Sequence, residues 1–248
     1  YQACLKSQHD YCQRFGIDHY IAQEPKIHWP HGPHPTANFF FEKLQVRSLF
    51  ADGYDQVLYL DADVLVTPDA HNIFEKYPDP AMYYGWDESM EIGQIGETMY
   101  GGSADVMDRD PYVTRVIDDL DDELPEKWGK NERDKYIYYN MGVMLMGRDS
   151  IDWMTDEGKL MSVQNYPNIY DFNDQTYFNA LIQKYSPNKS IDYSFNRINL
   201  GERDEKLERY KADFIHYAGP CLYGIEGEFS EQGKVQAILE DHRQLYGG

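Results

Sequence analysis

The stretch QVLYLDADVLVTPD, residues 56–69, decides the fold of this chain. Its first part, residues 57–60, is apolar and short, as expected of a buried β-strand. Asp61 and Asp63 then interrupt the apolar run before it resumes at Val64. A carboxylate beside a buried strand costs free energy unless a partner compensates its charge. We therefore ask what lies opposite these two acids.

The sequence around this stretch alternates between predicted helices and predicted strands. Gly16 and Gly53 follow two of the helical segments as stop signals. This alternation favours an α/β fold in which helices flank a mostly parallel central sheet. No linker rich in Pro, Gly or Ser divides the chain, so we expect one domain over residues 1–248, with its first strand missing upstream of residue 1. The predicted helices are 3–15, 39–53, 150–164, 173–185 and 231–246, and the predicted strands are 17–22, 57–60, 81–86, 136–147 and 212–219.

The charge of the chain excludes several classes of partner. Its 248 residues include 23 Lys and Arg against 43 Asp and Glu, which gives a formal net charge of −20. Such a field repels nucleic acid and anionic membrane surfaces. No apolar run approaches the roughly 20 residues of a membrane span, and the small number of cysteines favours a reducing, cytoplasmic location. A phosphate-bearing substrate would need a metal ion or a local group of donors.

The two aspartates suit a divalent cation. Ligands of α/β proteins bind beyond the carboxyl ends of the strands, which is where Asp61 and Asp63 stand. Residues i and i+2 of an extended chain face the same side, so both carboxylates are directed to one point. His216 ends a second apolar strand in FIHYAG. Two carboxylates and one imidazole favour Mn²⁺ over Mg²⁺. The simpler alternative is that the two acids cap a turn.

Five motifs occur along the chain in this order: FEKL with Lys43, LYLDADVLV with Asp61 and Asp63, YNMGVMLM with Asn140, NDQTYFN with Asp174 and Gln175, and HYAG with His216 and Gly219. Together they resemble the retaining GT-A glycosyltransferases of family 8, the group of glycogenin and bacterial lipopolysaccharide galactosyltransferases. The resemblance implies a Rossmann-like GT-A fold and a metal-dependent hexosyltransferase. The implied donor is a nucleotide sugar, expected to be a UDP-sugar. The implied acceptor is a hydroxyl group of a glycan or other molecule, and the transfer would proceed with retention.

The resemblance also implies a role for each matching residue. Asp61, Asp63 and His216 would hold Mn²⁺ or Mg²⁺ against the donor diphosphate, with Asp61 also near the ribose. Lys43 and Asp174 would hold the donor sugar or phosphate. Gln175 would lie beneath the anomeric carbon, and Asn140 and Gly219 would adjoin the donor. The family usually has a lysine after the last motif, but HYAGPCLYG contains none. Apart from the resemblance, Asp87 ends the strand at 81–86, where it would face the sugar or acceptor.

Two other functions fit parts of this pattern. A phosphohydrolase of the haloacid dehalogenase type also begins with a strand that ends in Asp-x-Asp, here Asp61 and Asp63. That motif places Thr or Val where this chain has Leu65, and it requires a later Asp-Asp pair after a strand. A nucleotide-sugar-binding module without catalysis is the other alternative. Release of nucleotide from a sugar donor would exclude the binding module, and release of phosphate from a simple ester would favour the phosphohydrolase.

Overall fold

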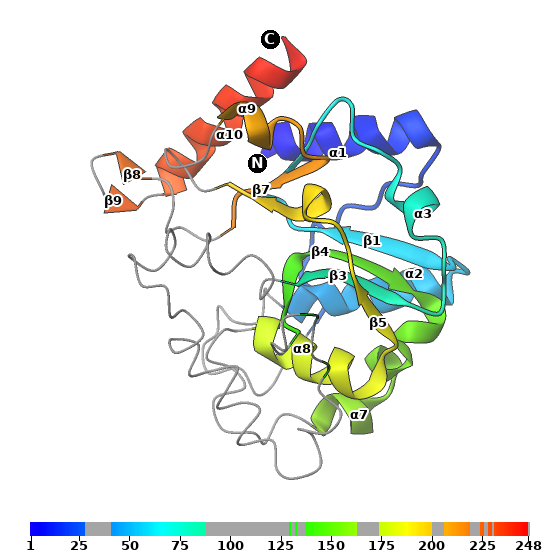
Figure 1. Cartoon of the computed structure of the whole chain (residues 1–248). Coiled ribbons are helices and arrows are strands. Elements are labelled where there is room, and N and C mark those ends of the chain that lie inside the picture. The colour runs from blue at the N-terminus through cyan, green and yellow to red at the C-terminus, as the bar shows by residue number, and fades with distance from the viewer. Residues whose placement is uncertain are drawn as a thin grey trace.

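The structure is a computed structural model that describes residues 1–27, 41–87, 129, 132, 137–162, 174–199, 206–218, 224–225, 228–229 and 231–247. Two sheets form the middle of the molecule, with α1 and α10 on one side and α2, α7 and α8 on the other (Figure 1). The larger sheet has the order β1 (Gln56–Leu60), β4 (Tyr139–Gly147), β3 (Tyr83–Asp87) and β5 (Asn188–Ser190). The smaller sheet has the order β2 (Val64–Val66), β7 (Phe214–His216) and β6 (Arg197–Ile198).

Helices of very different length cover these sheets. The long helices are α1 (Gln2–Phe15), α8 (Asp174–Tyr185) and α10 (Glu231–Tyr246). The short helices are α2 (Val46–Ala51), α3 (Ile73–Lys76), α7 (Glu157–Met161) and α9 (Lys206–Arg209), and β8 (Gly224–Ile225) pairs with β9 (Glu228–Phe229). Within the part of the chain that is described, no helix is long and apolar enough to cross a membrane.

The strand directions differ from the expectation of a mostly parallel sheet. Both β1 and β3 run antiparallel to β4, and β2 runs antiparallel to β7. The parallel pairs among the described strands of these two sheets are β3 with β5 and β6 with β7. A continuous apolar run shows that a strand is buried on both faces, but it carries no information on direction. All nine residues of β4 are buried, so its composition suits either orientation.

Successive residues of the central strands face different cores, as the pleat of a strand requires. In β4, Met144 and Met146 pack toward α2 and α8, whereas Val143 and Leu145 pack toward α1 and the smaller sheet. In β2, Leu65 joins Ile215 and Ile238 in a third core beneath α10. The strands before and after the two acids, β1 and β2, thus belong to different sheets, and Asp61 and Asp63 lie in the turn between them.

Three predicted elements differ from the structure. Residues 17–22 form no strand, because they follow α1 as a mostly exposed segment that pairs with no strand among the described residues. The predicted helix at 39–53 is a 3₁₀ turn over residues 41–45 followed by α2, and residues 39–40 lie outside the described part. The predicted helix at 150–164 is interrupted at Asp156, whose side chain accepts a hydrogen bond from the Lys159 amide at 3.1 Å and so starts α7 as a new helix. Within the described residues the other predicted helices and strands are confirmed, with ends shifted by a few residues. The predicted ends at 136, 163–164, 173 and 219 lie outside the described part.

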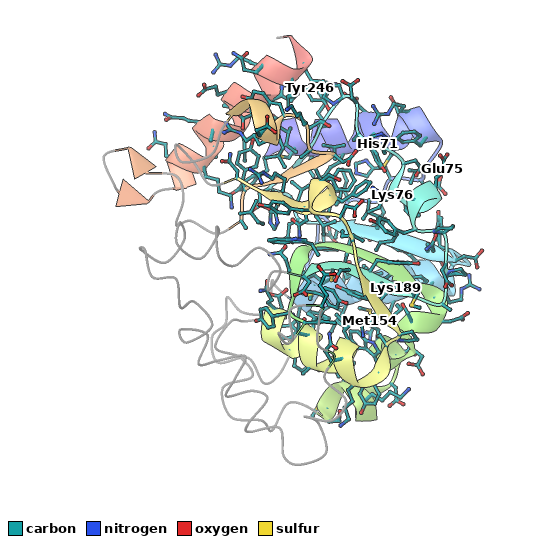
Figure 2. The ribbon with its side chains drawn as sticks, viewed as in Figure 1. His71, Glu75, Lys76, Met154, Lys189 and Tyr246 are labelled. Carbon is teal, nitrogen blue, oxygen red and sulfur yellow. The ribbon has the colours of Figure 1, made fainter. Side chains whose placement is uncertain are left out.

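Buried polar contacts fix α10 to the rest of the fold. The Arg209 guanidinium donates to both carboxylate oxygens of Asp241, at 2.8 and 2.7 Å. The Tyr217 hydroxyl, which follows β7, donates to the same carboxylate at 2.7 Å. At the far end of α10, where Figure 2 labels Tyr246, the hydroxyl of this residue donates to the Val66 carbonyl at 2.7 Å. The helix is therefore held at two points along its length against β2 and β7.

Candidate metal and donor site

The turn between β1 and β2 presents the two carboxylates, and its backbone is held from two sides. The Asp61 amide donates to the Gly142 carbonyl of β4 at 2.8 Å. From α1, the Gln8 side-chain amide donates to the carbonyls of Asp61 and Val64, at 3.1 and 2.9 Å. Ser7 of the same helix accepts from the Val66 amide at 3.0 Å. The position of both acids is therefore set by β4 and α1.

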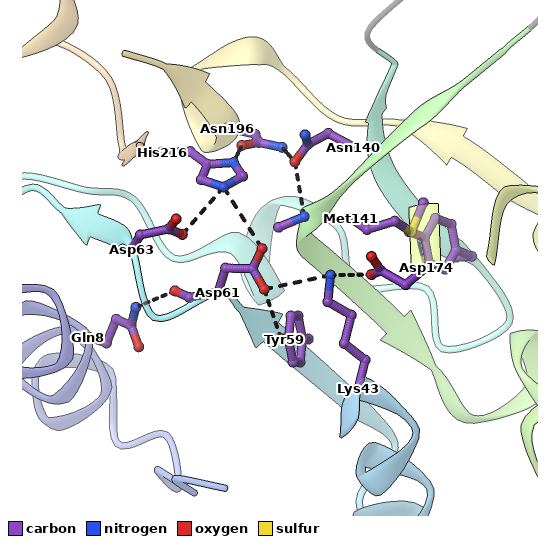
Figure 3. Close-up of polar contacts among 12 residues, drawn as sticks. Gln8, Lys43, Tyr59, Asp61, Asp63, Asn140, Met141, Asp174, Asn196 and His216 are labelled. Carbon is purple, nitrogen blue, oxygen red and sulfur yellow. Dashed lines mark hydrogen bonds and ion pairs between the residues drawn. The ribbon is translucent and has the colours of Figure 1, made fainter. Parts of the chain in front are cut away.

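His216 completes a cluster with these acids, as predicted. In the antiparallel pair of β2 and β7, Val64 is registered opposite His216. The ring nitrogen Nε2 lies 3.5 Å from Asp63 Oδ1 and 3.9 Å from Asp61 Oδ2. One ligand atom from each of the three residues lies within 4.8 Å of the others, in the arrangement that Figure 3 shows. Gly142 makes room for the ring, because a Cβ there would lie 2.0 Å from His216 Cε1.

A chain of hydrogen bonds fixes which nitrogen of His216 faces the acids (Figure 3). The Gly142 backbone amide donates to the Asn140 side chain at 2.9 Å, so the accepting atom is Oδ1. Asn196 Nδ2 donates to that same oxygen at 2.9 Å, which leaves Asn196 Oδ1 to face His216 Nδ1 at 2.9 Å. Nδ1 must therefore carry the proton. In the neutral ring, Nε2 then presents a lone pair toward Asp61 and Asp63.

The cluster fits a divalent cation on its own chemistry. Asp63 Oδ1 is buried without a hydrogen-bond partner and faces the Nε2 lone pair. Burial alone would raise the pKa of Asp63, but the His216 ring when it is charged and the Lys234 ammonium hold the pKa well below its usual range, so the carboxylate is ionised at neutral pH. Two carboxylates and an imidazole nitrogen form a mixed oxygen and nitrogen ligand set. Asp63 Oδ1 has no hydrogen-bond donor, and a bound cation would supply the positive charge that this oxygen needs.

A second group of charges adjoins the cluster through Asp61. The Lys43 ammonium lies 2.6 Å from Asp174 Oδ2 and 3.6 Å from Asp61 Oδ1, and both Lys43 and Asp174 are buried. Lys43 comes from the 3₁₀ turn before α2, and Asp174 is the first residue of α8. The Tyr59 hydroxyl donates to Asp61 Oδ1 at 2.8 Å. One carboxylate oxygen of Asp61 thus accepts a hydrogen bond from Tyr59 and forms an ion pair with Lys43.

Burial and charge set the protonation of this second group. Burial alone lowers the pKa of Lys43, but the carboxylates of Asp174 and Asp61 raise it by more, so the ammonium stays charged. Burial raises the pKa of Asp174 above its usual value, although Lys43 acts in the opposite direction. Burial and the nearby charge of Asp61 raise the pKa of Tyr59 well above its usual value. Tyr59 therefore remains a hydrogen-bond donor over the physiological pH range.

The other predicted site residues lie in different surroundings. Asn140 is buried beside the cluster and contacts Gly142 and Asn196. Gln175 is half-buried in the first turn of α8. Asp87 is fully buried at the end of β3, where its carboxylate accepts from the Tyr138 amide at 3.0 Å across an irregular strand pair. Gly219 lies outside the described residues.

Sequence reasoning missed three residues of the site. Asn196 lies in the stretch YSFNRIN, which shows no periodicity. Tyr59 looks like an ordinary strand residue. Lys234 of α10 places its ammonium 2.6 Å from Asp63 Oδ2, yet a lysine on a terminal helix usually indicates only a solvated face. One signal was present, because Lys234, Ile238 and Asp241 are spaced by four and three residues and so share one helix face.

The chain resembles known proteins in sequence family and in fold. The family model described as Glycosyl transferase family 8 matches residues 20–221. A search of curated proteins finds no match. Among solved structures, a glycosyltransferase involved in the glycosylation of the major capsid of PBCV-1 has a TM-score of 0.55 at 15% identity, covering 96% of this chain and 91% of that one. The galactosyltransferase LgtC in complex with donor and acceptor sugar analogs has a TM-score of 0.46 at 18% identity, covering 84% and 67%. The first likeness confirms the predicted α/β fold of the GT-A type.

Proposed function

This chain belongs to glycosyl transferase family 8, and from that premise we propose that it transfers a hexose from a UDP-sugar to a hydroxyl group of a glycan or similar acceptor. The observation that carries the proposal is the cluster of Asp61, Asp63 and His216, with its buried, unpartnered Asp63 Oδ1. A glycosyltransferase expels a nucleoside diphosphate, and the negative charge on that leaving group requires stabilisation. The cluster is suited to hold the cation that provides it.

Asp61, Asp63 and His216 are the residues that would hold Mn²⁺ or Mg²⁺. When bound, the cation supplies Lewis-acid stabilisation of the leaving diphosphate, which a protein with a net charge of −20 lacks in its overall field. Asn196 keeps the proton on the far nitrogen of His216, so the near nitrogen is available. Tyr59 and Lys43 neutralise part of the charge on Asp61 Oδ1. Oδ2 of Asp61 faces His216 and is the oxygen oriented toward the cluster.

The charged pair of Lys43 and Asp174 is the proposed contact for the hydroxyl groups of the donor sugar. An ammonium with three donors and a carboxylate acceptor, both buried and already oriented, can bind a hydroxyl group as donor and acceptor together. We place Asn140 and Gly219 beside the donor as well. Asp87 accepts a hydrogen bond from the Tyr138 amide and so helps to hold β3 and β4 together. Its contact with sugar or acceptor stays a prediction.

Transfer with retention is the stereochemical part of the proposal. Gln175, one residue after Asp174, is the residue proposed to lie beneath the anomeric carbon. An amide is a poor nucleophile, and a covalent intermediate on it is unfavourable compared with one on a carboxylate. The hydroxyl acceptor would then attack from the face that the diphosphate leaves. A Gln175→Ala variant would slow this reaction modestly, because the amide orients the sugar and forms no bond to it.

The test is nucleotide release from a panel of nucleotide sugars. UDP-hexoses with Mn²⁺ should release UDP, excess EDTA should stop the release, and Asp63→Asn should abolish it while the protein stays folded. Undiminished release in EDTA would refute the metal-dependent reaction, and release of phosphate from simple esters would favour a phosphohydrolase. With an α-linked donor, NMR of the product should show an α-linkage, and a β-linked product would refute retention.

A further inference from the structure

We propose that Lys234 is a resident cation of this site, which pairs with Asp63 before the divalent ion binds and then turns to bind the diphosphate of the donor. The inference rests on the proposed function and adds a ligand-binding residue to it. Its starting point is the unequal surroundings of the two Asp63 oxygens. Oδ2 accepts from the Lys234 ammonium at 2.6 Å, whereas Oδ1 has no hydrogen-bond partner and faces His216.

Lys234 is held in place by a buried framework. The residue is 5% exposed, and its ammonium lies 5.5 Å from the centre of the Tyr1 ring. Asp241 stands seven residues, or about two helical turns, further along the same face of α10. Arg209 and Tyr217 bind Asp241, and Tyr217 directly follows the ligand His216. Burial of an ammonium costs free energy, and Lys234 is buried next to Asp63, a proposed metal ligand.

The chemistry of the site gives Lys234 a second partner. A divalent ion at Asp63 Oδ1 would place two positive charges beside the ammonium, and like charges at such distances repel each other. A diphosphate bound to the same ion carries several acceptor oxygens next to Lys234. The long lysine stem lets the ammonium turn from carboxylate to phosphate while α10 stays fixed. Lys43, the other buried ammonium of the site, is held between Asp174 and Asp61.

Two binding measurements on the whole chain test the proposal. Calorimetry measures the affinity of the metal-free protein for Mn²⁺ and the affinity of the Mn²⁺-saturated protein for UDP. In Lys234→Met the competing cation is gone, so Mn²⁺ should bind several-fold more tightly. UDP should bind about tenfold more weakly, because a charged hydrogen bond to phosphate is lost. Lys234→Arg keeps the charge and should keep most of the UDP affinity. Lys211→Met removes an exposed lysine paired with Glu208 and should change neither affinity.

The outcomes separate this inference from the proposed function. If the wild type binds neither Mn²⁺ nor UDP, the proposed function is wrong. If the wild type binds Mn²⁺ and Lys234→Met binds it no more tightly, the resident-cation role is wrong, whatever UDP does. Unchanged UDP affinity in Lys234→Met would refute the diphosphate contact. Thermal melts verify that each variant is folded. Lys234→Gln, which keeps a hydrogen-bond donor without the charge, replaces the methionine variant if that variant unfolds.

Discussion

At the scale of single residues, Asp63 contributes to stability as well as to the site. Its carboxylate forms an ion pair with Lys234 inside the protein, so the folded state favours the ionised form. A carboxyl group whose pKa is lower in the folded than in the unfolded chain stabilises the fold above its unfolded pKa, near 4. That contribution disappears as the pH falls toward the lower, folded pKa. Asp63 therefore links the stability of the protein to acid pH.

Asp63→Asn should lower the free energy of unfolding by about 1.5–3 kcal/mol at neutral pH, measured by urea denaturation in EDTA. The difference from wild type should shrink steadily as the pH falls from about 5 to 2, because the wild-type carboxyl group becomes protonated. Asp10→Asn, which breaks the exposed pair with Lys6, serves as control and should change stability by less than about 1 kcal/mol. A difference for Asp63→Asn that stays constant with pH would contradict this account.

Asn196 should control the affinity for the cation without touching it. Asn196→Ala removes the acceptor that keeps the proton on His216 Nδ1, so Mn²⁺ affinity should fall about 10- to 100-fold. Asn72→Ala is the matched control, since it removes the side chain that caps α3 by accepting from the Phe74 amide. Both variants should lose some stability in a thermal melt, but calorimetry should show weaker Mn²⁺ binding in Asn196→Ala alone. Equal affinities would mean that Asn196 is purely structural.

At the scale of elements, the site depends on the close approach of β4 to β7. Gly142→Ala would place a methyl group where the His216 ring lies, with 2.0 Å between Cβ and Cε1. The ring must then move, so we expect loss of Mn²⁺ binding and a stability loss of about 1–3 kcal/mol. Gly158→Ala in α7 is the control, because the nearest atom to its Cβ is a side-chain oxygen of Asp156 at 3.2 Å. Normal Mn²⁺ binding in Gly142→Ala would show that His216 is not a ligand.

The predictability of each element follows from what its residues contact. Residues 56–66 and 174–185 were predictable, because their apolar periodicity reflects burial in a core. The grouping of Asp61, Asp63 and His216 was also predictable, since the acids and the histidine each end an apolar strand. Asn196 and Lys234 were not, because only contacts with side chains far away in the sequence make them site residues, and the spacing of Lys234 on its helix face does not reveal such contacts. The direction of β4 was not predictable for the same reason, since pairing is a property of two segments.

At the scale of the whole molecule, the net charge of −20 should oppose the approach of any nucleoside diphosphate. The cations at the site are local, whereas the repulsive field extends over a Debye length, which shrinks from about 30 Å at 0.01 M to about 8 Å at 0.15 M salt. The association rate of a fluorescent UDP analogue with the Mn²⁺-saturated protein should therefore rise over this range, measured by stopped flow. A rate that falls with salt would show that local cations dominate the encounter.

Two expectations about the whole chain remain predictions. We propose that residues 1–248 fold as one domain, which a single cooperative transition in calorimetry and denaturation would support. A cytoplasmic location was expected from the few cysteines. Cys4 and Cys12 are free thiols in the described structure.

The hydrogen bonds from α1 to the turn between β1 and β2 have a practical consequence for the design of protein variants. Gln8 and Ser7 form hydrogen bonds with the backbone around Asp61 and Val66, so α1 supports the proposed metal site. Deletion of α1 to obtain a smaller protein would remove these contacts. Affinity tags and fusion partners are therefore better attached through a spacer, and trimming should begin elsewhere.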